Sequence, residues 1–107
     1  MDKNEVKEIL DREIKQLDNF MNYHGITLVN LGYFLVEPFE IYVDPDDLET
    51  SPRYMWVVLQ EYKDIKLGYS VVFDPYNNNW GIAEHISSDE YVLVIGAETL
   101  KDALEGM

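Results

Sequence analysis

The sequence predicts an α+β fold of two layers, in which a long N-terminal helix and a short C-terminal helix cover a mostly antiparallel sheet of about five strands. Apolar residues recur at helical spacing only near the two ends of the chain, whereas the middle is rich in β-branched and aromatic residues. Only short, turn-forming segments separate the middle runs, so neighbouring strands should pair antiparallel. A length of 107 residues fits a single α+β domain, residues 1–107.

The N-terminal helix is expected over residues 4–23. Asp2 and Glu5 occupy capping-box positions, in which each side chain accepts a hydrogen bond from the other residue's backbone. Gly25 is expected to end the helix, because glycine adopts the left-handed conformation at little cost. The apolar residues that follow the 3–4 spacing of one helical face are Val6, Ile9, Leu10, Ile14, Leu17, Phe20 and Met21.

Strands are expected between the two helices, where β-branched and aromatic residues dominate. Gly32 marks a bulge or turn in the first run, and Pro38 limits how far that strand continues. Three asparagines after Asp74 suit the turn of a hairpin, since asparagine tolerates left-handed conformations. The expected strand runs are 26–31, 33–36, 39–43 (an edge strand), 54–62 (a central strand), 68–73, 80–86 and 91–95. The last element is a short amphipathic helix over 97–105, or a shorter version that Thr99 and Asp102 would cap.

The composition favours a soluble, cytoplasmic protein. The chain has no cysteine, its first residues lack the basic and apolar regions of a signal peptide, and no apolar run is long enough to span a membrane. The net charge of −13, with eight basic residues that do not cluster, argues against a nucleic-acid partner. The same acidity also aids solubility and needs no binding site to explain it.

Catalytic and metal-binding residues are not evident. The two histidines, His24 and His85, are explained structurally, His24 by the favourable meeting of an imidazolium with the end of the N-terminal helix. The acidic run beginning at Asp44 carries oxygen donors that would suit calcium, but it lacks the glycine of an EF-hand loop, and Pro45 stiffens it. We therefore expect a non-enzymatic protein without a cofactor.

The stretch from Glu37 to Glu49 is the most informative part of the sequence. It carries six carboxylates and no basic residue, interleaved with apolar and aromatic side chains. Tyrosine and tryptophan beside acidic residues are typical of protein-binding surfaces. The residues expected to bind a partner are Glu40, Tyr42, Asp44, Asp46, Asp47, Glu49, Tyr54 and Trp80, and the aromatics expected to be exposed are Tyr54, Trp56, Tyr62, Tyr76 and Trp80. Scattered surface aromatics without a partner are the alternative interpretation.

The function that these features favour is that of a small acidic protein that docks a basic protein partner and inhibits it. In size, acidity, lack of cysteine and α+β class, the chain is similar in kind to bacterial immunity proteins, which neutralise toxic nucleases. This similarity is one of composition and class, and it assigns no residues. Two alternatives stay open. One is a small-molecule or ion-binding domain with a pocket between the sheet and the N-terminal helix, and the other is a homodimer joined through an exposed strand edge.

Overall fold

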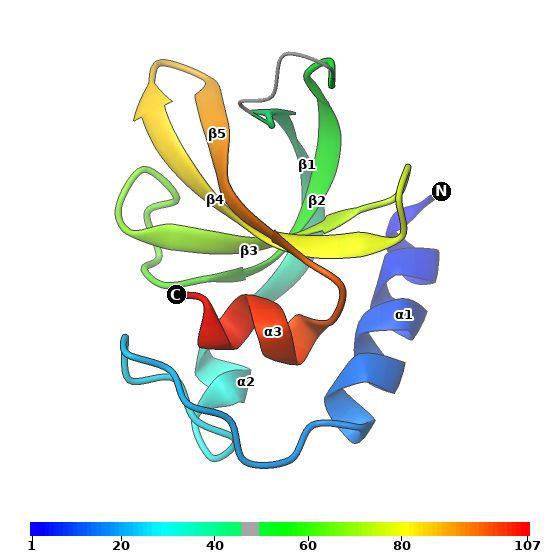
Figure 1. Cartoon of the computed structure of the whole chain (residues 1–107), viewed down its shortest axis with the longest axis vertical. Helices are drawn as coiled ribbons and strands as arrows, with labels where there is room; N and C mark the ends of the chain where they lie inside the picture. The colour runs from blue at the N-terminus through cyan, green and yellow to red at the C-terminus, as the bar shows by residue number, and fades with distance from the viewer. Residues whose placement is uncertain (46–49) are drawn as a thin grey trace.

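A computed structural model describes residues 1–45 and 50–107 and shows an α+β protein built on a small barrel (Figure 1). A helix near each end of the chain and a five-strand sheet confirm the predicted secondary-structure content. The elements are α1 (Lys3–Lys15), α2 (Leu31–Phe34), β1 (Leu35–Asp44), β2 (Arg53–Gln60), β3 (Tyr69–Asp74), β4 (Asn79–Ser87), β5 (Glu90–Ala97) and α3 (Leu100–Glu105).

The predicted two-layer arrangement is wrong, because the sheet closes on itself. The strands follow one another around the barrel in sequence order, and each is antiparallel to the next. An odd number of alternating strands leaves the first and the last pointing the same way. The closing pair between β1 and β5 is therefore parallel, and it joins Val43 to Tyr91 and Asp44 to Val92.

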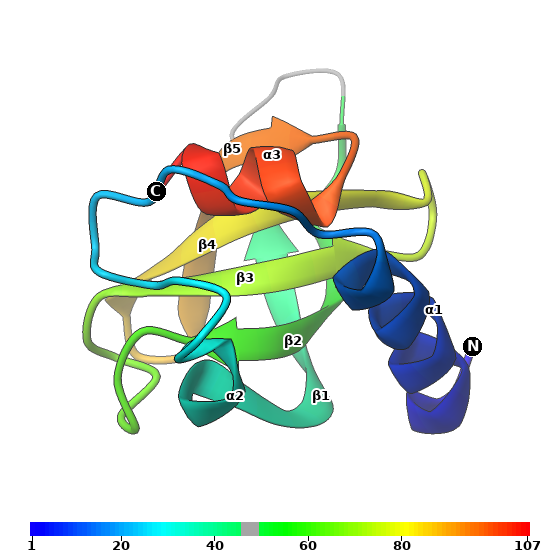
Figure 2. The ribbon, with the colours of Figure 1, turned by 90° about the horizontal axis from the view of Figure 1, so that it is seen from below.

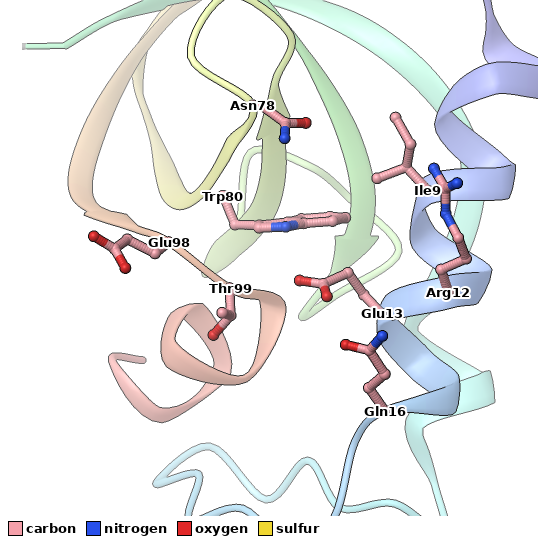
Figure 3. A pocket seen from close by; sticks show the side chains of 8 residues that line it. All are labelled: Ile9, Arg12, Glu13, Gln16, Asn78, Trp80, Glu98 and Thr99. Atoms are coloured by element: carbon pink, nitrogen blue, oxygen red, sulfur yellow. The ribbon is translucent and has the colours of Figure 1, made fainter.

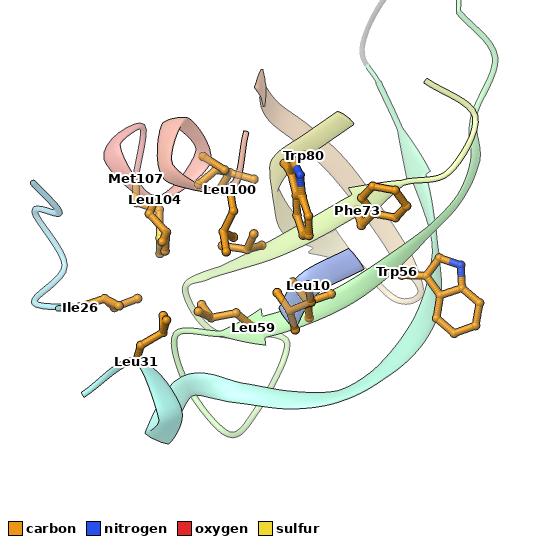
Figure 4. Close-up of a cluster of buried hydrophobic side chains, with 14 of the residues drawn as sticks. Leu10, Ile26, Leu31, Trp56, Leu59, Phe73, Trp80, Leu100, Leu104 and Met107 are labelled. Atoms are coloured by element: carbon orange, nitrogen blue, oxygen red, sulfur yellow. The ribbon is translucent and has the colours of Figure 1, made fainter. Parts of the chain in front are cut away.

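Closure divides the apolar residues into two cores. The barrel interior is filled by side chains that point inward from the strands, and its buried members are Ile41, Val43, Met55, Val57, Val72 and Ala83. A second core lies outside the barrel, where the helices pack on it (Figures 2 and 4). Because β2 contributes to both cores, its residues Met55–Leu59 are all buried, as predicted for a central strand.

Helix α1 begins as predicted and ends early. Its capping box is present, with Glu5 N–H donating to Asp2 at 2.9 Å and Asp2 N–H donating to Glu5 at 3.3 Å. The helix ends at Lys15 rather than at residue 23. The chain beyond it is irregular, and Asn22 joins it to the C-terminal helix: its amide donates to the Leu104 carbonyl at 2.6 Å, and its side-chain oxygen accepts from Ile26 N–H at 3.2 Å.

The expected strand over 26–31 is also wrong, and the expected strand over 33–36 is correct only at Leu35 and Val36. Thr27 and Asn30 bond each other's backbone N–H groups, which makes a turn, and the short helix α2 follows. The first strand starts at Leu35 and runs through Pro38, which the sequence had suggested as its limit. The proline is tolerated because the register with β2 shifts between Leu35 and Phe39, and proline is accommodated at such bulges.

The second half of the chain agrees with the prediction. Strands β3 and β4 form the hairpin, and Asn78 in its turn has the expected left-handed φ of 54°. The C-terminal helix is the shorter version, in which Thr99 accepts a hydrogen bond from Asp102 N–H at 3.1 Å. None of the helices in the described residues is both long and apolar enough to cross a membrane.

Candidate functional site

Three of the predicted partner-binding residues project from the same side of β1. Glu40, Tyr42 and Asp44 alternate with Ile41 and Val43, whose side chains fill the barrel interior. Since successive side chains of a strand point to opposite faces, the first three lie on the outer surface. The alternation that the sequence shows over 39–43 thus corresponds to side chains that point alternately into the barrel and to its outer surface.

Tyr42 forms an exposed aromatic pair with Tyr54. The two residues are register partners on β1 and β2, and their rings meet edge to face with centroids 5.0 Å apart. Tyr42 is 50% exposed and Tyr54 is 53% exposed. Each ring limits the motion of the other, so the pair offers apolar area at a low cost in conformational entropy on binding.

A shallow hollow lies beside this pair. It has a volume of about 170 Å³ and is bounded by the end of β1 and the turn between β4 and β5. Its lining residues are Tyr42, Asp44, Pro52, Ile86, Asp89, Glu90 and Tyr91, so no lysine or arginine of the described chain lines it. We refer to Glu40, Tyr42, Asp44, Tyr54, Ile86, Asp89, Glu90 and Tyr91 together as the Tyr42 surface.

The turn that supplies the far side of the hollow is held in place by His85. Ser88 has a left-handed φ of 48°, and a ring nitrogen of His85 bonds the Ser88 carbonyl at 2.6 Å. The imidazole also meets the Tyr91 ring edge to face, with centroids 5.3 Å apart. These contacts fix a two-residue turn that presents Asp89 and Glu90 to solvent.

The electrostatic potential of the Tyr42 surface is negative. Burial, and then the nearby carboxylates of Asp89 and Asp64, raise the pKa of the Tyr91 phenol above its ordinary value. The carboxylates raise it because they disfavour a second negative charge nearby. The same carboxylates would attract a cationic group placed here.

The basic residue next to Tyr54 does not offset this potential, because an aspartate neutralises it. The Arg53 guanidinium donates to Asp74, with Nη2 2.5 Å from one carboxylate oxygen and Nε 3.2 Å from both. Although burial alone would raise the pKa of Asp74, the hydrogen bonds from Arg53 and from Tyr76 N–H outweigh it and lower this pKa. The same bond raises the pKa of Arg53.

The structure brings four of the eight predicted site residues together, namely Glu40, Tyr42, Asp44 and Tyr54. Asp46, Asp47 and Glu49 lie outside the described residues. The expectation that Trp80 is exposed is wrong, because its side chain is only 4% exposed and packs against Phe73 with ring centroids 4.9 Å apart. The outer face of β4 is covered at this point, so Trp80 belongs to the outer core and not to the Tyr42 surface.

The other aromatic predictions divide in the same way. Trp56 was expected to be exposed and is 8% exposed, because it too lies in the outer core. Tyr62 and Tyr76 are exposed as expected. Ile86, Asp89 and Glu90 were not predicted as site residues. Their turn was visible in the sequence, but only the closure of the barrel brings it beside β1.

The histidines have structural partners, and that of His24 is not the predicted one. Helix α1 ends well before His24. The His24 ring instead bonds the Glu61 carboxylate and meets the Tyr69 ring edge to face, with centroids 5.3 Å apart. This cluster ties the segment after α1 to the barrel. No group of three or more histidine, aspartate or glutamate side chains in residues 1–45 and 50–107 is placed to hold a metal ion.

Comparisons with models of protein families, with curated proteins and with solved structures find no match to this chain.

Proposed function

We propose that the protein is a non-enzymatic binding module whose Tyr42 surface docks a basic protein and blocks it. The observation that carries the proposal is the combination of an exposed tyrosine pair with a carboxylate-lined hollow beside it. Aromatic anchors surrounded by charged residues are the usual make-up of an energetically focused interface. Such an inhibitor is similar in role to the immunity proteins, and a bacterial, cytoplasmic setting belongs to the same proposal.

Charge supports a basic partner. The net charge is −13, and residues 25–52 contribute six of the acids and no base. A surface of one sign accelerates the encounter with a partner of the opposite sign, most of all at low ionic strength. In the docked complex, a lysine or arginine of the partner would enter the hollow between Asp44 and Glu90, with its aliphatic portion against Tyr42.

The proposal is tested by capture followed by reconstitution. The tagged protein is used to retain partners from a lysate of its own source, and a retained basic protein is then purified for binding and activity assays. The surface variant is Asp89→Asn/Glu90→Gln. Its matched control is Glu8→Gln/Asp11→Asn, which removes the same charge from exposed positions on α1. A second pair compares Tyr42→Ala with Tyr33→Ala, an exposed tyrosine on α2.

We expect the surface variant to associate more slowly and to show a weaker salt dependence than its control. Tyr42→Ala should weaken binding by about 2 kcal/mol, or roughly thirtyfold, as truncation of a tyrosine anchor does. The purified partner should lose its own activity when the protein is bound. Equal binding by surface and control variants would overturn the assignment of this surface.

A strand-edge homodimer is the third hypothesis from the sequence. Among the described residues, β1 and β5 pair with each other at 43–44 and 91–92, so the closure of the barrel occupies part of both edges. Light scattering at several concentrations tests for a dimer directly, and a mass that rises with concentration would favour it.

A further inference from the structure

A second hollow lies on the barrel between α1 and the start of α3 (Figure 3). It has a volume of about 320 Å³, and its lining residues are Ile9, Arg12, Glu13, Gln16, Asn78, Trp80, Glu98 and Thr99. A smaller hollow of about 150 Å³ continues it along α1 and shares Glu13, Gln16 and Thr99. None of the residues that line this pocket belongs to the Tyr42 surface, so the inference goes beyond the proposed docking function.

The Trp80 side chain gives the pocket a directed hydrogen-bond donor. Figure 3 shows the indole lying across the pocket, with Asn78 on one side and Glu13 and Thr99 on the other. Trp80 is 96% buried, since only 4% of it is exposed. Its ring N–H donates to no residue of the described chain. Every side-chain nitrogen or oxygen of the described residues that is fully shielded from solvent has a hydrogen-bond partner, so the indole nitrogen is not fully shielded. The N–H is therefore reachable from a hollow that Trp80 lines, and an acceptor bound there can satisfy it.

Arg12 supplies a positive charge at one end of the pocket. Its side chain is exposed, and no carboxylate of the described residues pairs with it. Of the other basic residues, Lys3, Lys7, Arg53 and Lys101 each pair with an acid. A guanidinium without an acidic partner, which lines the same pocket as the Trp80 indole, is suited to a carboxylate.

Two carboxylates, Glu13 and Glu98, also line the pocket. Glu98 precedes α3 and lies across the indole from Arg12 (Figure 3). Glu13 holds the two helices together, because one of its oxygens accepts from Leu100 N–H at 3.0 Å. The pocket thus has Arg12 and Glu13 on the α1 side and Glu98 on the α3 side of an apolar floor made by Ile9 and Trp80.

We propose that this pocket binds a small zwitterion with the chemistry of a free amino acid. Its carboxylate bonds Arg12 and the Trp80 N–H, its ammonium group faces Glu98 and Glu13, and its apolar portion lies on Ile9. The volume is at the lower limit for small-molecule sites, which suits an amino acid better than a nucleotide or a larger cofactor. This is the pocket between the sheet and the N-terminal helix that the sequence left open as an alternative.

The test uses Trp80 as its own reporter. In a Trp56→Phe background, Trp80 is the one remaining tryptophan, and each of the common amino acids is titrated singly while its emission is recorded. Calorimetric titration of the unaltered protein provides a second readout that does not depend on the substitution. Each ligand that binds is compared with its analogue lacking the amino group and with its analogue lacking the carboxylate.

We expect one or a few amino acids to change the emission in a saturable way, and both truncated analogues to bind at least about tenfold more weakly. Arg12→Gln and Glu98→Gln should each produce a similar loss, whereas Lys15→Gln and Glu8→Gln, exposed on α1 outside the pocket, should bind within about twofold of the parent. The highest concentration tested is about 10 mM, well above the dissociation constant of an ordinary small-ligand site, so absence of binding there would overturn the proposal. So would binding that Arg12→Gln leaves unchanged.

Discussion

The ion pair between Arg53 and Asp74 should be among the most sensitive positions for stability. Asp74→Ala removes the partner of a guanidinium whose side chain is 15% exposed, and the aspartate itself is 8% exposed. The same change removes the acceptor for Tyr76 N–H at 3.0 Å and for the Asn77 amide at 3.2 Å. The variant thus leaves the Arg53 charge, the Tyr76 N–H and the Asn77 amide without their acceptor at a site that is largely shielded from water.

The size of the effect follows from these contacts. Removing one member of a buried, hydrogen-bonded pair costs about 3–5 kcal/mol. Because Arg53 keeps some contact with water, we expect the lower value, about 3 kcal/mol. For a domain of this size, the midpoint of urea unfolding should fall by roughly 2 M and the melting temperature by about 13 °C.

Urea titration followed by circular dichroism measures the change. The matched control is Asp11→Ala on the exposed face of α1, which should alter the free energy of unfolding by less than about 0.5 kcal/mol. The double variant Arg53→Met/Asp74→Ala should recover part of the loss, because no charge is then left unpaired. A cost below about 1 kcal/mol for Asp74→Ala would contradict a stabilising role for the Arg53–Asp74 pair.

Three further predictions concern the free energy of unfolding. The pKa of Asp74 is lowered below its ordinary value of 3.8, so the stabilisation by Asp74 should be present above pH 3.8 and be lost as the pH falls through the lowered pKa. In an acid titration, the free energies of unfolding of the parent and of Asp74→Ala should therefore converge. Gly81→Ala should cost about 2 kcal/mol in a thermal melt, because the added methyl would lie 2.7 Å from the Ile95 carbonyl oxygen; a variant as stable as the parent would contradict the close packing of β4 on β5. Thr99→Ala should cost about 1 kcal/mol through loss of the cap on Asp102 N–H, and Thr99→Ser should restore most of it.

The features that were predictable are those set by neighbours in the sequence. The Asp2–Glu5 capping box, the left-handed turn at Asn78 and the Thr99 cap each depend on residues within a few positions. The end of α1 was not predictable in this way. Leu17 and Phe20 continue the helical spacing and do pack on the core, but Asn22 bonds Leu104 at the other end of the chain, which no local pattern reveals.

Closure of the barrel was the largest feature that the sequence did not reveal. Alternation along a strand shows that one side is buried, but it does not show whether that side faces a flat second layer or the interior of a barrel. The small residues Gly81 and Ala83 on β4 allow the sheet to curve tightly, and this signal was present. The parallel pairing of β1 with β5 follows only once the number of strands is known.

Closure also explains which site residues were placed correctly. Glu40, Tyr42 and Asp44 were grouped by their period of two, and Tyr54 joined them through its register with Tyr42. Trp80 also points outward, but α1 and α3 pack over that part of the barrel. Whether an outward side chain meets a helix or water is decided by tertiary packing, and so the burial of Trp80 could not be predicted from β4 alone.

Quantitative capture from the source lysate, at low and at moderate salt, tests whether the Tyr42 surface docks a basic protein. Four baits are compared: the parent, Asp89→Asn/Glu90→Gln, Tyr42→Ala, and the control Glu8→Gln/Asp11→Asn. We expect the parent and the control to retain one basic protein in near-stoichiometric amount, less of it at moderate salt, and the two surface variants to lose it. Retention of the same protein by all four baits, or by none, would contradict the claim.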